Sequence, residues 1–449
     1  MEQALRLGAM DAELLEHHLL SPQGRDRLPR GGSVGVAGGA GCGDVARIGI
    51  ALEEDSVAAA GFEATGCATM TAACSAAVAL ARGREVLDVA QVGTEQIAAE
   101  LGGVDSSVAA LLCAAPPGDG PQPEVVGVTL ELWRDADNDP DRSCCSARAV
   151  RSARALAHRM GLPHLTLDLR DEFRAGVVQP FLDGHAAGET PNPCVLCNGN
   201  VRIDAMLELA ASLGAGALAT GHYARVHEDG DGPLLRVAAD PAKDQSYMLA
   251  GLAPESIARL RFPLGDLTKP RVRELAERAG MSVARAPESQ DLCFLAGTGK
   301  AAFFARHGGP GDRPGEIVDR AGRVLARHRG HHHFTVGQRR GLGIGGGAPR
   351  YVLETDARAN QVVVGPREAL RRRQVRVRAA TLHRDAARVD RVKLRYRSRP
   401  LPATIADSPA AGAHDRLRID LAEPVLGATP GQAAVLMDGD VVVGTATIA

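Results

Sequence analysis

The chain has 449 residues, of which 45% are apolar, and its formal net charge of −2 excludes nucleic-acid binding through a uniformly basic surface. Its length suits roughly three domains, and no apolar run approaches the roughly 20 residues that span a membrane. Residues 1–20 lack the basic start and apolar centre of a signal peptide, so we expect a cytoplasmic protein. Nine cysteines in such a chain are expected to serve catalysis or metal binding rather than a disulfide framework.

Residues 1–100 are expected to mix helices and strands. A helix and a polar loop are predicted over 1–30, and the alternation of apolar and polar residues over 33–65 predicts a β-hairpin. The Ala-rich segment 68–83 favours a helix, and a second helix is expected over 87–100.

From residue 101 the pattern changes to alternating helices and strands. The Gly-rich turn LGGVDSS precedes an apolar helix, and the apolar strand Glu124–Leu130 follows. A helix over Ala147–Met160 and a strand over His164–Asp168 continue the pattern, which extends through Ala217–Tyr223. This alternation is typical of the α/β class, with a parallel sheet covered by helices.

After about residue 300 the chain becomes rich in Gly and in short alternating runs. Examples are YVLETDARANQVVVG at 351–365 and VVVGTATIA at 441–449, which predict one or two small β domains. The Arg-rich stretch Arg371–Arg378 lies between these runs. Its first residues, Arg371–Arg373, form either a solvated face or a phosphate contact, and we favour the phosphate contact.

A candidate phosphate-binding loop, GGVDSS, precedes the apolar helix. Glycines let backbone N–H groups approach a phosphate, the helix start adds partial positive charge, and serine hydroxyls donate hydrogen bonds. The alternative is an ordinary strand-to-helix turn, but the whole pattern at a helix start favours phosphate binding. The predicted ligands are Gly102, Gly103, Val104, Asp105, Ser106 and Ser107.

The segment GGVDSSVAALL resembles the loop of the N-type ATP pyrophosphatases, which cleave ATP to AMP and pyrophosphate. Further motifs, in the same order along the chain, are similar to those of the tRNA-specific 2-thiouridylases. They are GVTLELW (127–133), RSCCS (142–146), TPNPCVLCN (190–198), LATGHYAR (218–225), KDQSYML (243–249), PLGDLTKPRVRELAERAG (263–280), ESQDLCFL (288–295), FTVGQRRGLGI (334–344) and LRYRS (394–398). The resemblance covers the chain from about residue 101 to its C-terminus and is highly specific.

This resemblance implies a fold and a reaction. The fold is a parallel-sheet ATP pyrophosphatase domain of the adenine nucleotide alpha hydrolase type at 101–300, a small central domain at 301–368 and a C-terminal β-barrel at 369–449. In the implied reaction, ATP with Mg²⁺ adenylates the C2 oxygen of the wobble uridine of a tRNA, and a cysteine persulfide then delivers sulfur as AMP leaves. Adenylation supplies the good leaving group that a urea-like carbonyl lacks. The implied partners are tRNA and a sulfur donor, either a cysteine desulfurase or a sulfur-relay protein.

Two distant cysteines match the sulfur-handling positions of this family. By resemblance, Cys197 is the nucleophile and Cys293 carries the persulfide. A thiolate is the reactive form of cysteine, and a thiol pair can resolve a persulfide by forming a disulfide. Cys194 stands where many relatives have Asp, and it is either a small buried residue or a third thiolate for an iron–sulfur cluster with the other two. Persulfide chemistry is the favoured interpretation.

The remaining matched positions concern the nucleotide and the tRNA. Gly221 matches a glycine that lets the backbone approach the nucleotide, and Leu130 lies either near adenine or in the core. His222 is left out of catalysis, because such a histidine is more often packed than catalytic. Predicted contacts with the flipped uridine and the tRNA are Asn192, Pro193, Cys194, Lys243, Asp244, Gln245, Arg395 and Tyr396.

The N-terminal region resembles the NifU/IscU iron–sulfur scaffolds. The motifs GCGD and FEATGC match the first two cysteine motifs, which makes Cys42, Asp44 and Cys67 candidate cluster ligands. The third scaffold cysteine has no match, because the phosphate loop begins where the last scaffold helix should start, and Cys74 is not at the family position. The missing ligand favours cluster transfer, docking or a degenerate domain over cluster assembly by this domain alone.

The junction between the two regions leaves two alternatives. Segment Ile97–Leu101 stands where relatives have an apolar strand and a serine before the glycines. Either this segment ends the scaffold and also starts the sheet, or the strand is shortened and ATP affinity suffers. The first hypothesis for the whole chain is therefore a tRNA-uridine 2-sulfurtransferase. The second is an iron–sulfur carrier with an impaired ATP site, in which residues 101–449 remain as an RNA-binding body.

Overall fold

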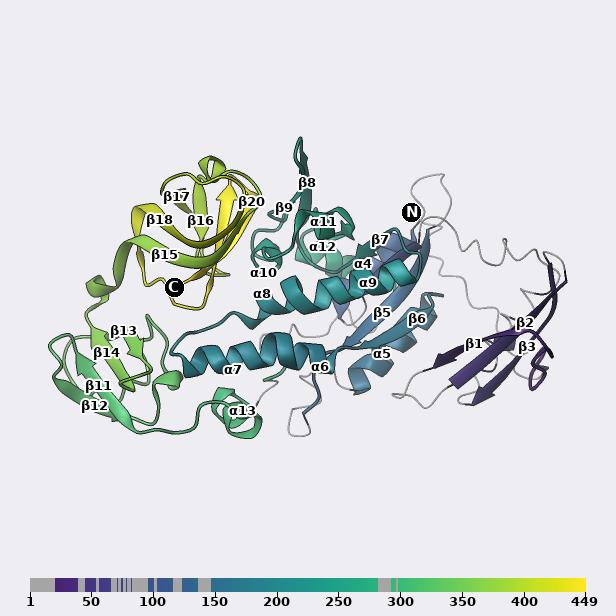
Figure 1. The fold of residues 1–449 in the computed structure, drawn as a ribbon, viewed down its shortest axis with the longest axis horizontal. Helices are drawn as coiled ribbons and strands as arrows, with labels where there is room; N and C mark the ends of the chain where they lie inside the picture. Colours follow the sequence, from purple (N-terminus) through teal and green to yellow (C-terminus); the bar gives the residue numbers. More distant parts are fainter. Residues whose placement is uncertain are drawn as a thin grey trace.

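The computed structural model describes residues 21–38, 45–53, 56–65, 96–100, 103–115, 123–135, 147–281, 292–295 and 298–449, together with positions 71, 74, 75, 78 and 82. The predicted ligands Cys42, Asp44, Cys67 and Gly102 lie outside these residues, as do the RSCCS motif and most of the helices expected over 1–30 and 68–83. A small sheet forms one end of the molecule, an α/β unit its middle and two β-rich units its other end (Figure 1).

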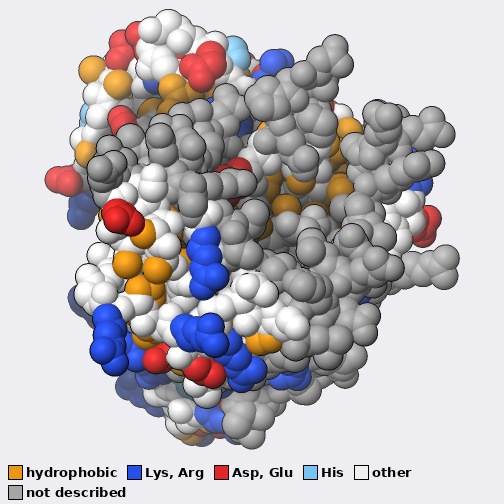
Figure 2. Space-filling view, turned by 90° about the vertical axis from the view of Figure 1, so that its right-hand side faces the viewer, with side chains coloured by type: hydrophobic (Ala, Val, Ile, Leu, Met, Phe, Trp, Pro, Cys, Tyr) orange, Lys and Arg blue, Asp and Glu red, His pale blue; other side chains and the backbone are white. Residues whose placement is uncertain are grey.

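The N-terminal sheet has three antiparallel strands, β1 (Ser33–Gly38), β2 (Val45–Glu53) and β3 (Ser56–Thr65). The alternation that predicted a hairpin therefore forms a three-stranded meander with β2 in its centre. Its small core consists of Ala46, Val57, Ala60, Phe62, Cys74 and Val78. Seen from this end, the described surface carries several Lys and Arg side chains and scattered hydrophobic ones (Figure 2).

The central sheet is parallel throughout, with the strand order β10-β7-β4-β5-β6. Its strands are β4 (Gln96–Glu100), β5 (Glu124–Glu131), β6 (His164–Asp168), β7 (Ala217–Ala219) and β10 (Leu260–Arg261). The expectation of a helix over 87–100 is wrong for its last five residues, which form β4 between β5 and β7. Backbone pairing on both sides overrides the helix propensity of the alanines in this strand.

Helices cover both faces of this sheet, which confirms the α/β class predicted from the sequence. One face packs against α4 (Val104–Ala114), α5 (Ala147–Arg159) and α12 (Lys269–Arg278). The other face lies against two long helical segments, and each of these contains a π-helical turn. The first comprises α6 (Arg170–Phe173), η1 (Arg174–Val178) and α7 (Gln179–Ala186). The second comprises α8 (Pro193–Cys197), η2 (Asn198–Arg202) and α9 (Ile203–Ser212).

The two π-helical turns lie against each other. A Cβ atom built on Gly176 in η1 would lie 2.7 Å from Cγ2 of Val201 in η2, so glycine permits this close approach. The two helical segments run side by side in Figure 1. Insertions of this kind recur at functional sites, and here one follows Cys197 directly.

The central β-rich unit follows α13 (Lys300–His307) and contains a sheet of order β12-β11-β14-β13. These strands are β11 (Gly315–Asp319), β12 (Val324–His328), β13 (Tyr351–Asp356) and β14 (Gln361–Gly365), with the 3-10 turn η3 (His331–His333) after β12. This unit contacts the end of α7, where Oγ1 of Thr355 donates a 2.6 Å hydrogen bond to the carbonyl of Gly188.

The C-terminal unit is a closed barrel. Its strands are β15 (Arg371–Leu382), β16 (Arg391–Lys393), β17 (Leu401–Ile405), β18 (Gly412–Leu426), β19 (Ala433–Asp438) and β20 (Val441–Ile448). The pairing of β15 with both β18 and β20 closes it. A hairpin from the α/β unit, β8 (Arg225–Asp229) and β9 (Gly232–Arg236), extends the barrel sheet by pairing with β20. No motif in residues 225–236 predicts that this hairpin joins another domain.

The barrel also docks on the loop that leads into α8. Nε2 of Gln432 donates to the carbonyl of Thr190 at 2.6 Å, and Nη2 of Arg378 pairs with Oε2 of Glu189 at 2.8 Å. These contacts fix the segment that carries the TPNPCVLCN motif. Among the described residues, none of the helices combines the length and apolarity that crossing a membrane requires.

Candidate active site

The phosphate loop enters α4 at Gly103, with extended backbone at this residue. The hydroxyl of Ser106 accepts a hydrogen bond from the backbone N–H of Gly103 at 3.0 Å, and the hydroxyl of Ser107 donates to the carbonyl of Gly103 at 2.6 Å. The local sequence therefore shapes the turn at the positive end of α4. Gly221 packs directly on it, since a Cβ there would lie 2.5 Å from the backbone nitrogen of Ser106.

Asp105 of this loop is held by two side chains from other segments. Nζ of Lys269 lies 2.5 Å from Oδ1 of Asp105, and the hydroxyl of Tyr223 donates to the same oxygen at 2.9 Å. Lys269 is the first residue of α12 and is only 6% exposed. The sequence reasoning missed Lys269, although the lysine lies in a matched motif at a helix start. The ion pair between Lys269 and Asp105 places a cation beside the predicted phosphate ligands.

Leu130 lies near the end of β5 and is 5% exposed within the large apolar cluster of the α/β unit. Its core role is thus clear from the packing. A contact with adenine at this position stays a prediction.

The C-x-x-C motif begins the helix α8, and its own residues explain why. Pro193 takes the first helical position, and the side chain of Asn192 caps the helix by accepting hydrogen bonds from the N–H groups of Cys194 at 3.1 Å and Val195 at 3.4 Å. Cys194 and Cys197 are three positions apart, so they lie on the same side of the helix. Burial raises the pKa of the Cys194 thiol. Cys197 is also buried, with 8% of its surface exposed, and belongs to the large apolar cluster.

Cys293 lies in a turn almost 100 residues further along the chain, yet it packs against the same apolar cluster that contains Cys197. The cluster includes the aromatic rings of Phe173, Phe181 and Phe294, with Phe181 and Phe294 5.2 Å apart between centroids. Cys194, Cys197 and Cys293 form no disulfide in the described part of the chain. Both predicted sulfur-handling cysteines therefore contact the same extended apolar core.

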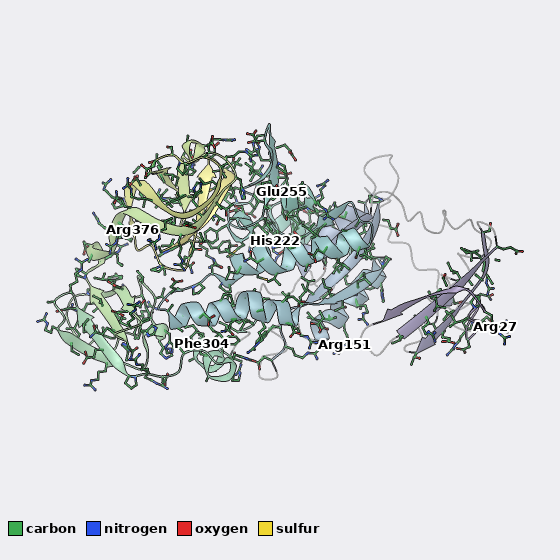
Figure 3. All side chains as sticks on the ribbon, in the orientation of Figure 1. Arg27, Arg151, His222, Glu255, Phe304 and Arg376 are labelled. Atoms are coloured by element: carbon green, nitrogen blue, oxygen red, sulfur yellow. The ribbon has the colours of Figure 1, made fainter. Side chains whose placement is uncertain are left out.

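Arg202, in η2, is a second residue that the sequence reasoning missed. Burial lowers the pKa of its guanidinium, and attraction to Cys293 acts in the opposite direction. Burial and the Arg202 charge also lower the pKa of His222 to about 3, so this imidazole is neutral near pH 7. Its Nδ1 lies 2.9 Å from the hydroxyl of Thr220. His222 lies in the middle of the α/β unit, near the second helical segment (Figure 3).

Two predicted tRNA positions have their side chains engaged inside the protein. Asp244 is 4% exposed, and its oxygens accept from the hydroxyl of Ser246 at 3.0 Å and from Nζ of Lys393 at 3.1 Å. The carboxylate therefore anchors this segment to the barrel, and a contact of Asp244 with tRNA stays a prediction. The Oε1 atom of Gln245 accepts from the N–H of Tyr223 at 2.9 Å. Lys243, beside them, is half-buried.

Arg395 and Tyr396 come from the barrel and reach toward α8. Arg395 is exposed, and its Nη2 donates to the carbonyl of Gly427 at 2.8 Å. The ring centroid of Tyr396 lies 6.2 Å from that of Tyr247, whose hydroxyl donates to the carbonyl of Ala433 at 2.9 Å. Burial raises the pKa of Tyr247 to about 12, and a hydrogen bond with Asn192 opposes this shift. Tyr247 thus links the barrel to the cap of the cysteine helix.

Family models match almost the whole chain. The tRNA methyl transferase HUP domain matches residues 95–297, the tRNA methyl transferase PRC-barrel domain 302–366, and the aminomethyltransferase beta-barrel domain 369–448. The NifU-like N terminal domain matches 12–113. The NifU-like match and the HUP-domain match share residues 95–113, which contain β4, the phosphate loop and most of α4.

Curated relatives match over similar lengths. The bifunctional protein NifU/MnmA of Rubrobacter xylanophilus is 40% identical and covers 96% of this chain and 97% of its own. The tRNA-specific 2-thiouridylase MnmA of Geobacter metallireducens is 42% identical, covering 78% of this chain and 95% of its own. A solved U34-tRNA thiolase, NcsA from Methanococcus maripaludis with its [4Fe-4S] cluster, is 17% identical over 44% of this chain and 61% of that one. Its TM-score of 0.29 is too low to support an argument.

Proposed function

The chain belongs to the tRNA-specific 2-thiouridylase family with a NifU-like N-terminal domain, and on this premise we propose how its residues carry out the reaction. The chain is a tRNA-uridine 2-sulfurtransferase that uses ATP. The recognition of both families from sequence motifs is thereby confirmed. The proposal extends to the assignment of individual residues, and it rests on one observation: two cysteines nearly 100 residues apart meet one buried cluster beside a cation.

At the nucleotide end, the backbone N–H groups from Gly102 to Ser107 and the start of α4 bind the phosphates of ATP. Lys269 adds a positive charge beside them, and its release from Asp105 frees both groups for the incoming nucleotide. The Asp105 carboxylate is the kind of oxygen ligand that Mg²⁺ prefers, so the donor set fits this ion. When bound, Mg²⁺ would neutralise part of the polyphosphate charge. Attack of the uridine C2 oxygen on the α-phosphorus gives the adenylated base and pyrophosphate.

At the sulfur end, Cys293 carries the persulfide and Cys197 resolves it. The terminal sulfur of the Cys293 persulfide attacks C2, and AMP leaves with the former C2 oxygen. The thiolate of Cys197 then attacks the sulfur of Cys293, which releases 2-thiouridine and leaves a disulfide between the two cysteines. A thiol reductant restores both thiols. The Arg202 guanidinium favours the anionic sulfur at Cys293, since a nearby cation stabilises a thiolate or persulfide anion.

The tRNA binds where the barrel meets α8. Asn192 and Pro193 shape the pocket for the flipped base, and Tyr396 offers a ring for stacking. Lys243 and Arg395 supply positive charge, and the exposed arginines of β15 extend it, including Arg376, which is labelled in Figure 3. This local basic face reconciles an RNA substrate with a net charge of −2.

An iron–sulfur cluster is the alternative use of the same thiols. Such clusters require thiolate ligands. Cys194, Cys197 and Cys293 form no disulfide among the described residues, and two of them lie on one side of α8, so the donor set fits. These three would hold the cluster, which would supply an open iron for sulfide. In the N-terminal domain, Cys42, Asp44 and Cys67 remain proposed ligands for a cluster to be transferred.

Mass spectrometry of nucleosides tests the proposal. The full chain is incubated with ATP, unmodified tRNA and a persulfide source, a cysteine desulfurase or a sulfur-relay protein, and 2-thiouridine is measured. We expect 2-thiouridine that depends on ATP, on Cys197 and on Cys293. Anaerobic reconstitution followed by visible absorption separates the alternatives, because a cluster lost when Cys194 or Cys293 is replaced would move iron–sulfur chemistry into the active site.

A further inference from the structure

A run of three histidines, His331–His333, forms the 3-10 turn η3 in the central β-rich unit, away from the cysteines. The first of them is already engaged. The ring of His331 has Nδ1 3.2 Å from Oδ1 of Asn360 and Nε2 3.2 Å from the carbonyl of Ala186. His331 therefore ties the central unit to the end of α7, and neither of its nitrogens is available to a ligand.

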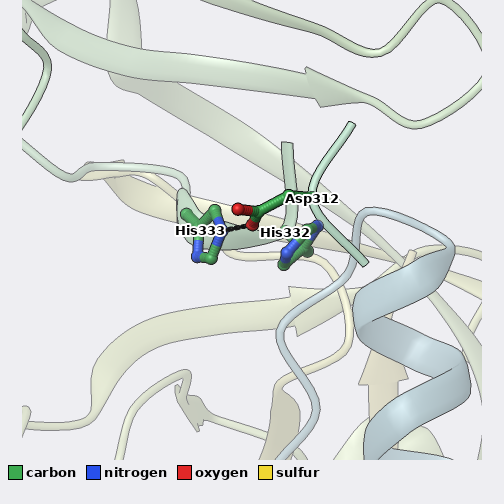
Figure 4. A group of neighbouring side chains, drawn as sticks. All are labelled: Asp312, His332 and His333. Atoms are coloured by element: carbon green, nitrogen blue, oxygen red, sulfur yellow. Dashed lines mark hydrogen bonds and ion pairs between the residues drawn. The ribbon is translucent and has the colours of Figure 1, made fainter. Parts of the chain in front are cut away.

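The other two histidines converge with an aspartate from a different loop. One ligand atom from each of Asp312, His332 and His333 lies within 4.8 Å of those from the other two (Figure 4). Nε2 of His333 lies 3.3 Å from Oδ1 of Asp312. The second oxygen of Asp312 accepts from Nε of Arg329 at 2.7 Å, so the carboxylate is oriented with Oδ1 toward the imidazoles.

His332 is the most informative member of this group. It is 4% exposed, yet within the described part of the chain its ring makes no hydrogen bond. Packing alone fixes the ring, since a Cβ on Gly330 would lie 2.3 Å from its Cε1 atom and the ring of Phe304 is 5.7 Å away between centroids. Neither nitrogen of this ring is among the fully buried side-chain atoms that lack a partner in the described residues, so both keep some contact with solvent and can be reached by an ion.

The geometry points to a binding site for a divalent transition-metal ion, and we propose that Asp312, His332 and His333 bind Zn²⁺. Two imidazoles and one carboxylate are ligands that Zn²⁺ accepts, and the same set also suits Fe²⁺. Ca²⁺ and Mg²⁺ prefer sites made of oxygen alone, so the two nitrogens disfavour them. A water molecule or a further ligand completes the coordination.

The bound ion would hold together two parts of the central unit and the helix α13. Asp312 comes from the loop after α13, and the two histidines come from the turn after β12. Nζ of Lys300, the first residue of α13, donates to the carbonyl of His332 at 2.9 Å. Because α13 begins a few residues after Cys293, the ion would stabilise the attachment of the segment that carries this cysteine.

Metal binding by the full chain tests the proposal. All proteins carry Ser at Cys42, Cys67, Cys194, Cys197 and Cys293, so that none of the thiols proposed as cluster ligands binds the ion. After treatment with a chelator, each is loaded with Zn²⁺, and the bound zinc is counted by elemental analysis. We expect His333→Asn and Asp312→Asn each to lose about one equivalent of zinc relative to the parent. The control His227→Asn, on the hairpin strand β8, is expected to lose none.

Two further measurements make the result decisive. Zn²⁺ is expected to raise the melting temperature of the parent but not of Asp312→Asn, whose exposed position preserves the fold. X-ray absorption of the zinc-loaded parent is expected to show imidazole and oxygen ligands, and loading with Fe²⁺ instead compares the two ions. Equal zinc content in parent and variants, or a sulfur-rich shell, would overturn the proposal. None of these readouts depends on tRNA thiolation.

Discussion

At the nucleotide end of the candidate site, polar contacts hold Asp105 between Lys269 and Tyr223. At the sulfur end, Cys197 and Cys293 lie in an apolar cluster of aromatic rings with one cation, Arg202, nearby. This contrast supports the proposed division of the site, with the phosphates of ATP at the polar end and sulfur transfer at the apolar end. The comparison suggests that activation and sulfur transfer can be disabled separately, and four changes test this.

Replacing Cys197 should give the largest effect. Cys197→Ser removes the resolving thiolate, so 2-thiouridine formation should fall by more than about 10³-fold, while tRNA-dependent pyrophosphate release persists. Nucleoside mass spectrometry and a pyrophosphate assay measure the two steps. Cys113→Ser is the matched control, because burial raises the pKa of this thiol to about 12 and makes it unreactive. Undiminished thiolation by Cys197→Ser would remove the assigned role.

Replacing Lys269 should disable the opposite end. Lys269→Ala removes the buried cation beside the phosphate loop, and pyrophosphate release should fall by about 10²-fold. Persulfide loading of Cys293, followed by peptide mass spectrometry, should not change. Arg271→Ala on the same helix is the control, since this half-buried residue pairs with the exposed Glu274. Loss of both activities together would mean that the two ends are not independent.

Replacing Arg202 should give an intermediate effect confined to the sulfur end. Without the guanidinium, the anionic sulfur at Cys293 is less stable, so thiolation at pH 7 should slow by about 10-fold. Iodoacetamide labelling of Cys293 at pH 7 should slow as well. Arg174→Gln, exposed on the neighbouring π-helical turn, serves as the control. An unchanged labelling profile for Arg202→Gln would argue against the electrostatic role.

The attachment of the barrel should matter least for either chemical step. Asp229 of β8 pairs with Arg384 at 2.6 Å and with Arg388 at 2.8 Å, and these guanidinium groups hold the pKa of its carboxyl well below its usual range. This stabilisation is present above the unfolded pKa of about 3.9 and is lost as the pH falls through the lower folded value. Asp229→Asn should therefore lower the melting temperature by a few degrees at pH 7.

The same variant has a built-in control. The difference in melting temperature between Asp229→Asn and the parent should shrink as the pH is lowered below about 4, because the carboxyl of the unfolded parent then binds a proton while that of the folded parent is still ionised. Thiolation at neutral pH should change by less than about 3-fold. A difference that stays constant with pH would show that packing, rather than charge, accounts for the effect.

Two local elements of the site could be predicted from the sequence. The glycines and serines of the phosphate loop bond to one another at the start of α4, and Asn192 and Pro193 start the cysteine helix α8. In both, neighbouring residues supply the hydrogen bonds, so a short motif is sufficient. The α/β class was also predictable, because helix and strand periodicities alternate along the chain.

Other features required contacts between distant segments. The strand β4 forms where Ala-rich sequence favoured a helix, because β5 and β7 pair with both of its edges. Asp244 matched a tRNA-binding motif, yet Lys393 from the barrel and Ser246 engage its carboxylate inside the protein. The hairpin β8–β9 joins the barrel sheet by pairing with β20. No motif within the hairpin predicts this pairing.

By itself, the sequence determined the family and the fold class, and it predicted which residues carry phosphate and sulfur chemistry. Only the tertiary structure decided that Cys293 packs on the cluster of Cys197, that Lys269 reaches Asp105, and that two histidines meet Asp312. The physical reason is that hydrogen bonds of turns and caps act between neighbouring residues. Burial and ion pairing act between side chains that are distant in the sequence and meet only in the folded chain. A short sequence motif therefore cannot predict which of these side chains will be in contact.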